Sequence, residues 1–202
     1  MDTVDADMKI EDVRRQILLA ARHRFDRYGF GKTTMAEIAR DCGMSAANLY
    51  RYFASKGDIG ASIAEEWFAY TEGRMAAMAA AIEGDAAAKL EALILLRIDL
   101  IAELIAGSPH IDELIDQLCV ERLDLIAAHK DRCGITIAGI LEEGTKAGVF
   151  AVEDFATTAS TIQAATMKFY YPDFIRTCER GELVDEAKRV VALLVSGLGG
   201  RR

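Results

Sequence analysis

The sequence contains few residues that interrupt or cross-link a chain, with two prolines and four cysteines among 202 residues. So few prolines leave long segments free to form helices, and the abundance of Ala, Leu and Ile favours a mostly helical protein. The cysteines form no CxxC pair and have no regular spacing. They therefore indicate reduced thiols rather than a disulfide framework or a zinc site; they are Cys42, Cys119, Cys133 and Cys178.

Long apolar runs and enzyme motifs are also lacking. No uninterrupted apolar stretch reaches the length of a membrane span, and residues 1–7 are acidic where a signal peptide would be basic and then apolar. We therefore expect a cytoplasmic protein with no membrane partner. The chain has no glycine-rich phosphate loop, no HExxH and no GxSxG. We accordingly expect no enzyme and no cofactor.

The net charge of −8 argues against nucleic acid as a partner, but the charges are unevenly distributed. From Lys9 to Gly60 there are ten Lys and Arg against six Asp and Glu, a local balance of +4. The first eight residues carry −3, and the remainder from Ala61 carries −9. A basic N-terminal module on an acidic body is the asymmetry that phosphate binding requires.

Helical patterns begin after residues 1–8, which we expect to form a disordered tail. Apolar residues at helical spacing predict a first helix from Ile10 to Tyr28, ended by glycines. Thr33 or Thr34 is expected to cap a second helix, with Glu37 at the capping-box distance from Thr34.

Capping residues also predict two further helices. Gly43 provides a left-handed turn, and Ser45 is the expected N-cap of a very short third helix that ends near Phe53. Ser55 caps a fourth helix, which continues to Ile82.

Further helical patterns follow in the body of the chain, and no alternating run predicts a strand. We expect helices over residues 86–106, 109–118, 119–146, 154–171 and 182–198. The fold class is therefore all-α, with a helix-turn-helix domain at residues 9–56 and a larger helical domain at residues 57–202.

The segment from Lys32 to Lys56 has the layout of a helix-turn-helix, whose second helix enters the DNA major groove. On the third helix Leu49 and Phe53 lie on one side as an apolar anchor, while Ala47 and Arg51 point the opposite way. Small residues allow close approach to the groove, and Asn and Arg side chains can pair with base edges. We expect Tyr50, Tyr52 and Lys56 to contact phosphates, with half-burial against the core as the lesser alternative for Tyr50 or Tyr52.

The chain resembles the TetR/AcrR family of transcriptional regulators from about Ile10 to Ile63. The resemblance rests on Thr33-Thr34, the Ile-Ala pair of the second helix, Gly43-Met-Ser, Asn48-Leu-Tyr-Arg-Tyr-Phe and Ser55-Lys56. It implies a homodimer that binds a double-stranded palindromic operator and responds to a small molecule, as a repressor does. Met35 stands where some members of the family place a polar residue that reads a base, so we expect no such base contact from this position. The implied DNA-binding residues are Thr33, Thr34, Ser45, Ala46, Ala47, Asn48, Tyr50, Arg51, Tyr52 and Lys56.

The same resemblance implies that the helical domain at residues 57–202 serves ligand binding and dimerisation, and that residues 154–171 and 182–198 form the dimer interface. Small or β-branched residues such as Thr161 and Ala165 suit close helix packing, but they can also pack within one subunit. The effector is not readable, because apolar stripes fit a filled core as well as a ligand cavity. The residues concerned are Met75, Met78, Leu96, Leu100, Leu104, Phe169 and Tyr170.

Two alternatives remain open from the sequence. His110 with Asp112 and Glu113, or His129 with Cys133 one helical turn on, have the residue types of a metal site, although we expect no metal. A helical adaptor that uses the same fold for protein partners is the alternative to a DNA-binding regulator. The basic balance favours the regulator, and so does the set Asn48, Tyr50, Arg51 and Lys56, which we expect to be exposed and which an adaptor does not need.

Overall fold

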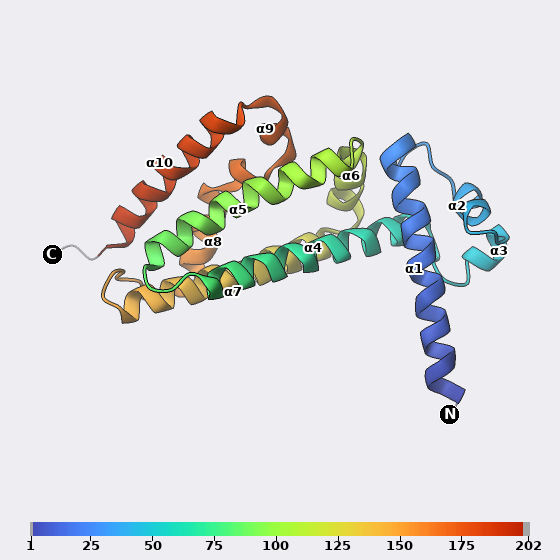
Figure 1. Ribbon diagram of the computed structural model, residues 1–202, viewed down its shortest axis with the longest axis horizontal. Coiled ribbons are helices and arrows are strands. Elements are labelled where there is room, and N and C mark those ends of the chain that lie inside the picture. The colour runs from blue at the N-terminus through green and yellow to red at the C-terminus, as the bar shows by residue number, and fades with distance from the viewer. Residues whose placement is uncertain (1, 200–202) are drawn as a thin grey trace. The chain divides into compact units, whose positions relative to one another are not determined.

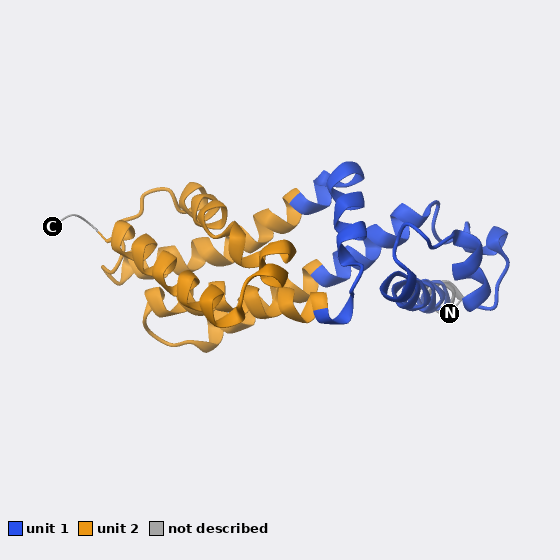
Figure 2. Ribbon diagram, turned by 90° about the horizontal axis from the view of Figure 1, so that it is seen from above, with its two compact units in different colours: residues 1–67, 106–126 blue, residues 68–105, 127–202 orange. Residues whose placement is uncertain are grey.

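A computed structural model of the protein describes residues 2–199 and, within them, the side chains from Met8 onward. All regular elements among these residues are helical, which confirms the all-α class. The chain forms two compact units (Figure 2). The first holds the residues up to Trp67 together with Ala106–Ile126, and the second holds Phe68–Ile105 and the residues from Ala127 on.

The first unit is built on a long helix, α1 (Asp2–Tyr28), with the short helices α2 (Met35–Asp41) and α3 (Ala46–Leu49) beside it (Figure 1). It also contains the beginning of α4 (Lys56–Ala81) and the whole of α6 (Ile111–Glu121). Its core is apolar and closed to solvent, with Ile17, Ile38, Leu49, Phe53 and Ile59 each at most 3% exposed. This core fixes α2 and α3 on α1, because burying such side chains is the main stabilising contribution in folding.

The predicted N-caps of α2 and α3 are present. Thr34 Oγ1 accepts from the Glu37 N–H while Glu37 Oε2 accepts from the Thr34 N–H, which completes a capping box. Ser45 Oγ accepts from the Asn48 N–H at the start of α3.

In the first unit, the helices that differ most from those expected are α1 and α3. Helix α1 begins at Asp2, so residues 2–8 are helical where the sequence suggested a disordered tail, and Met1 lies outside the described residues. Extending an existing helix fixes one residue for each hydrogen bond gained, which makes such an extension inexpensive. Helix α3 ends at Leu49 rather than near Phe53, and the chain continues as a turn in which the Phe53 N–H still donates to the Leu49 carbonyl.

The second unit packs several helices around one apolar core. It contains most of α4, α5 (Ala86–Gly107) and α7 (Leu123–Lys146), followed by α8 (Phe155–Ala165), the 3-10 turn η1 (Met167–Tyr170), α9 (Pro172–Thr177) and α10 (Arg180–Leu198). Side chains from α4, α5, α7, α8, η1 and α10 meet in this core. Met75, Leu100 and Phe169, which the sequence left between core and cavity, are at most 1% exposed.

The segment after α8 departs from the single helix predicted over residues 154–171. The Thr166 hydroxyl donates to the Ile162 carbonyl, and the Tyr170 hydroxyl donates to the Gln163 carbonyl at 2.7 Å. Because these side chains take carbonyls at the end of the helix, α8 stops at Ala165 and the chain tightens into η1. Pro172 then starts α9 at its first turn, where a missing N–H costs nothing.

No helix among the described residues is both long enough and apolar enough to cross a membrane.

Candidate nucleic-acid interface

Helix α3 presents the predicted polar front on a fixed apolar base. Leu49 is fully buried and Phe53 is 3% exposed, so they anchor the segment to the core of the first unit. On the other side Ala47 and Arg51 are exposed, Ala46 and Asn48 are half-buried, and Ser45 is exposed at the N-cap. The structure therefore brings five of the predicted contact residues together on one short segment.

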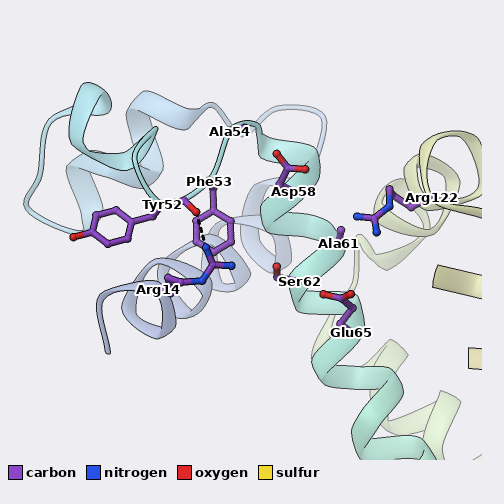
Figure 3. Close-up of a pocket in the computed structure, with 9 residues that line it drawn as sticks. All are labelled: Arg14, Tyr52, Phe53, Ala54, Asp58, Ala61, Ser62, Glu65 and Arg122. Carbon is purple, nitrogen blue, oxygen red and sulfur yellow. Dashed lines mark hydrogen bonds between the residues drawn. The ribbon is translucent and has the colours of Figure 1, made fainter. Parts of the chain in front are cut away.

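Two tyrosines follow this front, and they differ in exposure. The side chain of Tyr50 is 53% exposed, while Tyr52 is half-buried. The Tyr52 ring points away from the ring of Phe53 and keeps its hydroxyl at the outer edge of the segment (Figure 3). The exposure of Tyr50 is compatible with a phosphate contact, and for both tyrosines this contact stays a prediction.

Lys56 is in a different position from the one expected of a phosphate contact. Its ammonium group donates to the carbonyl oxygens of Phe30 at 2.6 Å, Thr33 at 2.9 Å and Gly31 at 3.4 Å. It also lies 4.3 Å from the centroid of the Phe30 ring. Burial lowers the pKa of Lys56. All three N–H donors are occupied in the turn between α1 and α2, so Lys56 holds that turn in place.

Thr33 also belongs to this turn rather than to the exposed surface. Its side chain is 2% exposed, and its hydroxyl donates to the Gly29 carbonyl at 2.9 Å. The expected DNA contact from Thr33 therefore has no structural support, and we leave this residue out of the proposed interface. Thr34 stays exposed, and its hydroxyl takes part in the capping box of α2. Met35, at the following position, is 9% exposed and packs in the core.

Arg14 on α1 supports the turn that follows α3. Its Nη1 donates to the Tyr52 carbonyl at 2.6 Å, and its guanidinium carbon lies 4.1 Å from the centroid of the Phe53 ring (Figure 3). The contact joins residues 38 positions apart, so no local pattern in the sequence indicates it. Arg14 thereby fixes the turn that follows α3 to the long helix α1.

A shallow hollow of about 230 Å³ lies beside this contact. Its charged side chains are mixed in sign, with Arg14 and Arg122 against Asp58 and Glu65 (Figure 3). Arg14 is engaged with Tyr52, and Arg122 donates to both carboxylate oxygens of Asp124 at 3.0 Å. These partners leave the hollow without a concentrated charge of one sign, so it gives no indication of an anion-binding site.

One basic residue of the first unit is neutralised within the fold. Arg24 on α1 donates to the Asp41 carboxylate on α2, and its Nη1 lies 3.4 Å from Glu37 Oε1. The hydrogen bond raises the pKa of Arg24 and lowers that of Asp41. Arg24 thus ties α2 to α1, and part of the local positive balance serves this packing rather than phosphate binding.

Helix α6 contacts the turn between α1 and α2 within the same unit. Glu113 Oε2 accepts from the Gly31 N–H at 2.6 Å, and Ser108, just before α6, donates to the Asp26 carboxylate at 2.5 Å. A Cβ on Gly60 would lie 2.7 Å from Leu114 Cδ1, so α4 and α6 approach closely at that glycine. No local pattern in the sequence indicates these contacts, because their partners are more than 50 positions apart.

The residues considered for a metal site have other partners. His129 Nδ1 lies 2.7 Å from Glu72 Oε1, and the imidazole stacks on the Phe68 ring at a centroid distance of 4.2 Å. Cys133 Sγ lies 3.6 Å from His129 Nε2, and Arg132 donates to Glu72 Oε2 at 2.7 Å. Among the side chains described from Met8 to Gly199, no three His, Cys, Asp or Glu residues are grouped in a way that would hold a metal ion.

Family models match both parts of the chain. A model described as bacterial regulatory proteins, tetR family, matches residues 17–63, which include α2 and α3. A model described as tetracyclin repressor-like, C-terminal domain, matches residues 86–191, more than half of the chain. A curated relative, the HTH-type transcriptional regulator HbdR of Aromatoleum sp. (strain CIB), is 40% identical over 50 residues, which are 25% of this chain and 22% of that protein.

Solved structures extend the similarity to nearly the whole chain. A TetR-family transcriptional regulator from Pectobacterium atrosepticum superposes with a TM-score of 0.72 and 18% identity, over 96% of this chain and 97% of the other. RolR in complex with its ligand resorcinol has a TM-score of 0.66 and 14% identity, over 96% of this chain and 91% of the other. At these identities the likeness shows a shared fold.

Proposed function

Because this chain belongs to the TetR family of bacterial regulatory proteins, we propose that it represses transcription by binding a palindromic DNA operator as a homodimer, and that a small molecule controls this binding. DNA binding and transcription regulation are properties of the family. The observation that carries the proposal is the exposed front of α3, in which Asn48, Tyr50 and Arg51 follow two alanines on an apolar base. Such a regulator acts in the cytoplasm, where the chromosome lies.

In the proposed DNA complex, one group of residues contacts base edges and another contacts phosphates. Asn48 and Arg51 are the candidates for base contacts, because an amide or a guanidinium can pair in two places with one base edge. Ala46 and Ala47 allow the helix backbone to approach the groove floor. Ser45, Tyr50 and Tyr52, together with Thr34 at the start of α2, are the candidates for phosphate contacts, which set the position of α3 without reading sequence.

The proposed dimer interface lies on α8 and α10. On α8 the buried Ala159 and Ile162 pack within the chain, whereas Thr161 and Ala165 remain exposed together with other small residues. On α10 the side chain of Leu193 is 74% exposed. A second copy would cover these exposed faces, and the small side chains would permit close helix packing. Replacing Leu193 by Asp should then convert a dimer into a monomer in analytical ultracentrifugation.

A small molecule would control DNA binding by changing the position of α6. This helix is bonded to the turn between α1 and α2 through Glu113 and follows α5 in the chain after three residues. We infer that a ligand which shifts α5 moves α6, and with it the turn that Lys56 and Glu113 hold. The resorcinol complex of RolR supports a ligand for this fold, but it does not identify the ligand of this chain.

The decisive experiment is to select bound sequences from random DNA duplexes with the purified full chain. The proposal predicts enrichment of a palindrome whose half-sites are roughly one helical turn or a multiple of it apart, because the two α3 helices of a dimer enter successive major grooves. An enriched site without two-fold symmetry would contradict the homodimeric mode. Failure to enrich any sequence would remove the DNA-binding proposal and favour an adaptor that binds proteins.

A further inference from the structure

The core of the second unit contains a buried arginine that has no acidic partner. Arg97 on α5 is 6% exposed and sits in the helix between the buried Leu93, Ile94 and Ile98. In the part of the chain that the structure describes, no carboxylate forms an ion pair with its guanidinium. The ionisable groups that favour its charge are the Tyr170 hydroxyl and the Cys133 thiol. Arginine stays charged in proteins, so an isolated positive charge remains inside the core.

The contacts that Arg97 does make leave part of the guanidinium open to a further partner. Its central carbon lies 3.3 Å from the centroid of the Tyr170 ring, so the ring covers one face of the group. The Nη1 atom is fully buried and makes no hydrogen bond. Burial lowers the pKa of Arg97, as expected for a charge kept from water. A buried cation with an unsatisfied donor is unfavourable unless an anion balances it.

A second buried polar group beside Tyr170 also lacks a partner. Gln163 on α8 is 2% exposed, and its backbone carbonyl accepts from the Tyr170 hydroxyl at 2.7 Å. Its side-chain oxygen, Oε1, is buried without a hydrogen bond. Tyr170 thus contacts two residues beside a largely apolar core, Arg97 with an unpaired donor and Gln163 with an unpaired acceptor. Native proteins seldom leave such groups unpaired, so these two call for an external partner.

Lys89, a second buried cation on α5, does have an acidic partner. It is 8% exposed on α5, and its ammonium group donates to Glu143 Oε2 on α7 at 2.5 Å. The carboxylate of Glu72, which together with Arg97 influences the pKa of His129 and of Cys133, is already bonded to His129 and Arg132. The missing negative charge at Arg97 is therefore specific to this position and is not a general feature of the unit.

We propose that Arg97 binds the carboxylate of a small organic acid, with the apolar body of the acid accommodated in the surrounding core. A guanidinium presents its N–H donors in a plane that matches the two oxygens of a carboxylate. Gln163 Oε1 would accept from a hydroxyl or amino group, if the acid carries one near its carboxylate. Binding of the acid at Arg97 does not depend on the proposed function. The role of that acid as the effector of a DNA-binding regulator does rest on the proposed function.

Entry to this closed site requires a covering group to move. Tyr170, which lies on the guanidinium, belongs to the single 3-10 turn η1. Such short turns have weaker hydrogen-bond geometry than α-helices, so η1 is the element whose displacement would expose Arg97.

The test measures the melting temperature of the full chain with benzoate and with octanoate, each at millimolar concentration and constant ionic strength. Benzamide and octanamide, which have the same shapes without the charge, are the controls. The two acids should raise the melting temperature and the amides should not, because a ligand that binds only the folded state stabilises it. No shift with either acid, or equal shifts with the amides, would overturn the proposal.

Variants locate the binding. Arg97→Met should weaken benzoate and octanoate binding in calorimetry by roughly tenfold or more, since a hydrogen-bonded charge is lost. Lys89→Met, which removes the other buried cation of α5, should leave the dissociation constants unchanged. If Arg97→Met does not fold, Arg97→Gln provides the same comparison. Undiminished binding in the Arg97 variant that folds would contradict the proposal.

DNA binding provides a separate readout. If the acids bind at Arg97 and weaken binding to the selected duplex, both this site and the proposed function stand. If they bind at Arg97 but the chain selects no duplex, the proposed function fails while the carboxylate site is supported. If the chain selects a duplex but neither benzoate nor octanoate binds, the carboxylate site is overturned while the proposed DNA binding stands.

Discussion

The ammonium group of Lys56 donates to the carbonyl oxygen of Phe30 at 2.6 Å, and thereby connects the start of α4 to the turn that precedes α2. Two further carbonyls of the same turn share this ammonium group. Lys56, which the sequence predicts to contact a phosphate, thus belongs to the contacts that hold the turn before α2. The effect of replacing it separates these two roles.

Lys56→Ala is expected to destabilise the fold as well as weaken DNA binding. Hydrogen bonds to charged groups contribute about 1.5–3 kcal/mol each when buried, and the partial exposure of Lys56 reduces the expected loss of unfolding free energy to about 1 kcal/mol. Urea unfolding measures this loss. Lys32→Ala, at an exposed position in the same turn, is the matched control and should unfold as the wild type does. Unchanged unfolding of Lys56→Ala would show that the three contacts contribute nothing.

Asn48→Ala is expected to change the preferred DNA sequence. If Asn48 pairs with a base, discrimination at one position of each half-site should fall by about 1–3 kcal/mol, as competition binding against single-base variants measures. Should Asn48→Ala keep both the preferred site and its affinity, direct readout by this residue is ruled out.

Tyr50→Phe should instead weaken binding to all duplexes alike, because removing a hydroxyl from an exposed ring deletes a phosphate contact and leaves base contacts intact. Fluorescence anisotropy on the selected site and on an unrelated duplex compares the two losses. A loss confined to the selected site would assign Tyr50 to base reading.

Binding to DNA should fall steeply with salt despite the acidic character of the whole chain. Each phosphate contact releases a counterion, so a plot of log affinity against log salt concentration should be linear with a negative slope. Tyr50→Phe should keep nearly the same slope because the tyrosine is uncharged, whereas Arg51→Gln should reduce the slope if Arg51 contacts a phosphate and preserve it if Arg51 reads a base. A flat plot for the wild type would contradict phosphate binding altogether.

Acidification is expected to destabilise the second unit through His129. Burial lowers the pKa of His129 below its ordinary value of 6.5, although Glu72 opposes this shift and Arg97 and Arg132 support it. The unfolded chain therefore binds the proton more readily, so the stabilising contribution is fully present above pH 6.5 and is lost as the pH falls through the folded-state value.

Urea unfolding of the wild type and of His129→Gln from pH 7.5 downward measures this contribution, and the variant should lose part of the pH dependence just below pH 6.5. His23→Gln, at an exposed position of α1, is the control. Identical pH profiles for the wild type and His129→Gln would contradict the assignment.

Two glycines of α7 should respond in opposite ways to alanine. A Cβ on Gly144 would lie 2.2 Å from Phe150 Cδ2 and 2.9 Å from the Ala86 Cβ, whereas one on Gly139 would meet nothing within 4 Å. Gly144→Ala should therefore cost about 1–3 kcal/mol of unfolding free energy through overpacking. Gly139→Ala should add about 0.5–1 kcal/mol, since alanine loses less backbone entropy in a helix. Equal effects in urea unfolding would contradict the close approach at Gly144.

The local features of this protein follow from the sequence by itself. The helices, the capping box of Thr34 with Glu37, the Ser45 cap and the apolar base formed by Leu49 depend on spacings of three or four residues. Helical geometry turns those spacings directly into neighbours. The exposed front of α3 follows from the same periodicity, and it is confirmed as a surface of the first unit.

Which polar side chains are bonded inside the fold and which stay on the surface is determined by the tertiary structure alone. Lys56 and Thr33 turn inward because their acceptors lie in the turn between α1 and α2, and Arg14 finds its carbonyl 38 positions along the chain. Arg97 resembles any other basic residue of a helix until the packing of α5, α8 and η1 buries it beside Tyr170. Hydrogen bonding and desolvation depend on which distant segments meet, and that information is absent from local spacing.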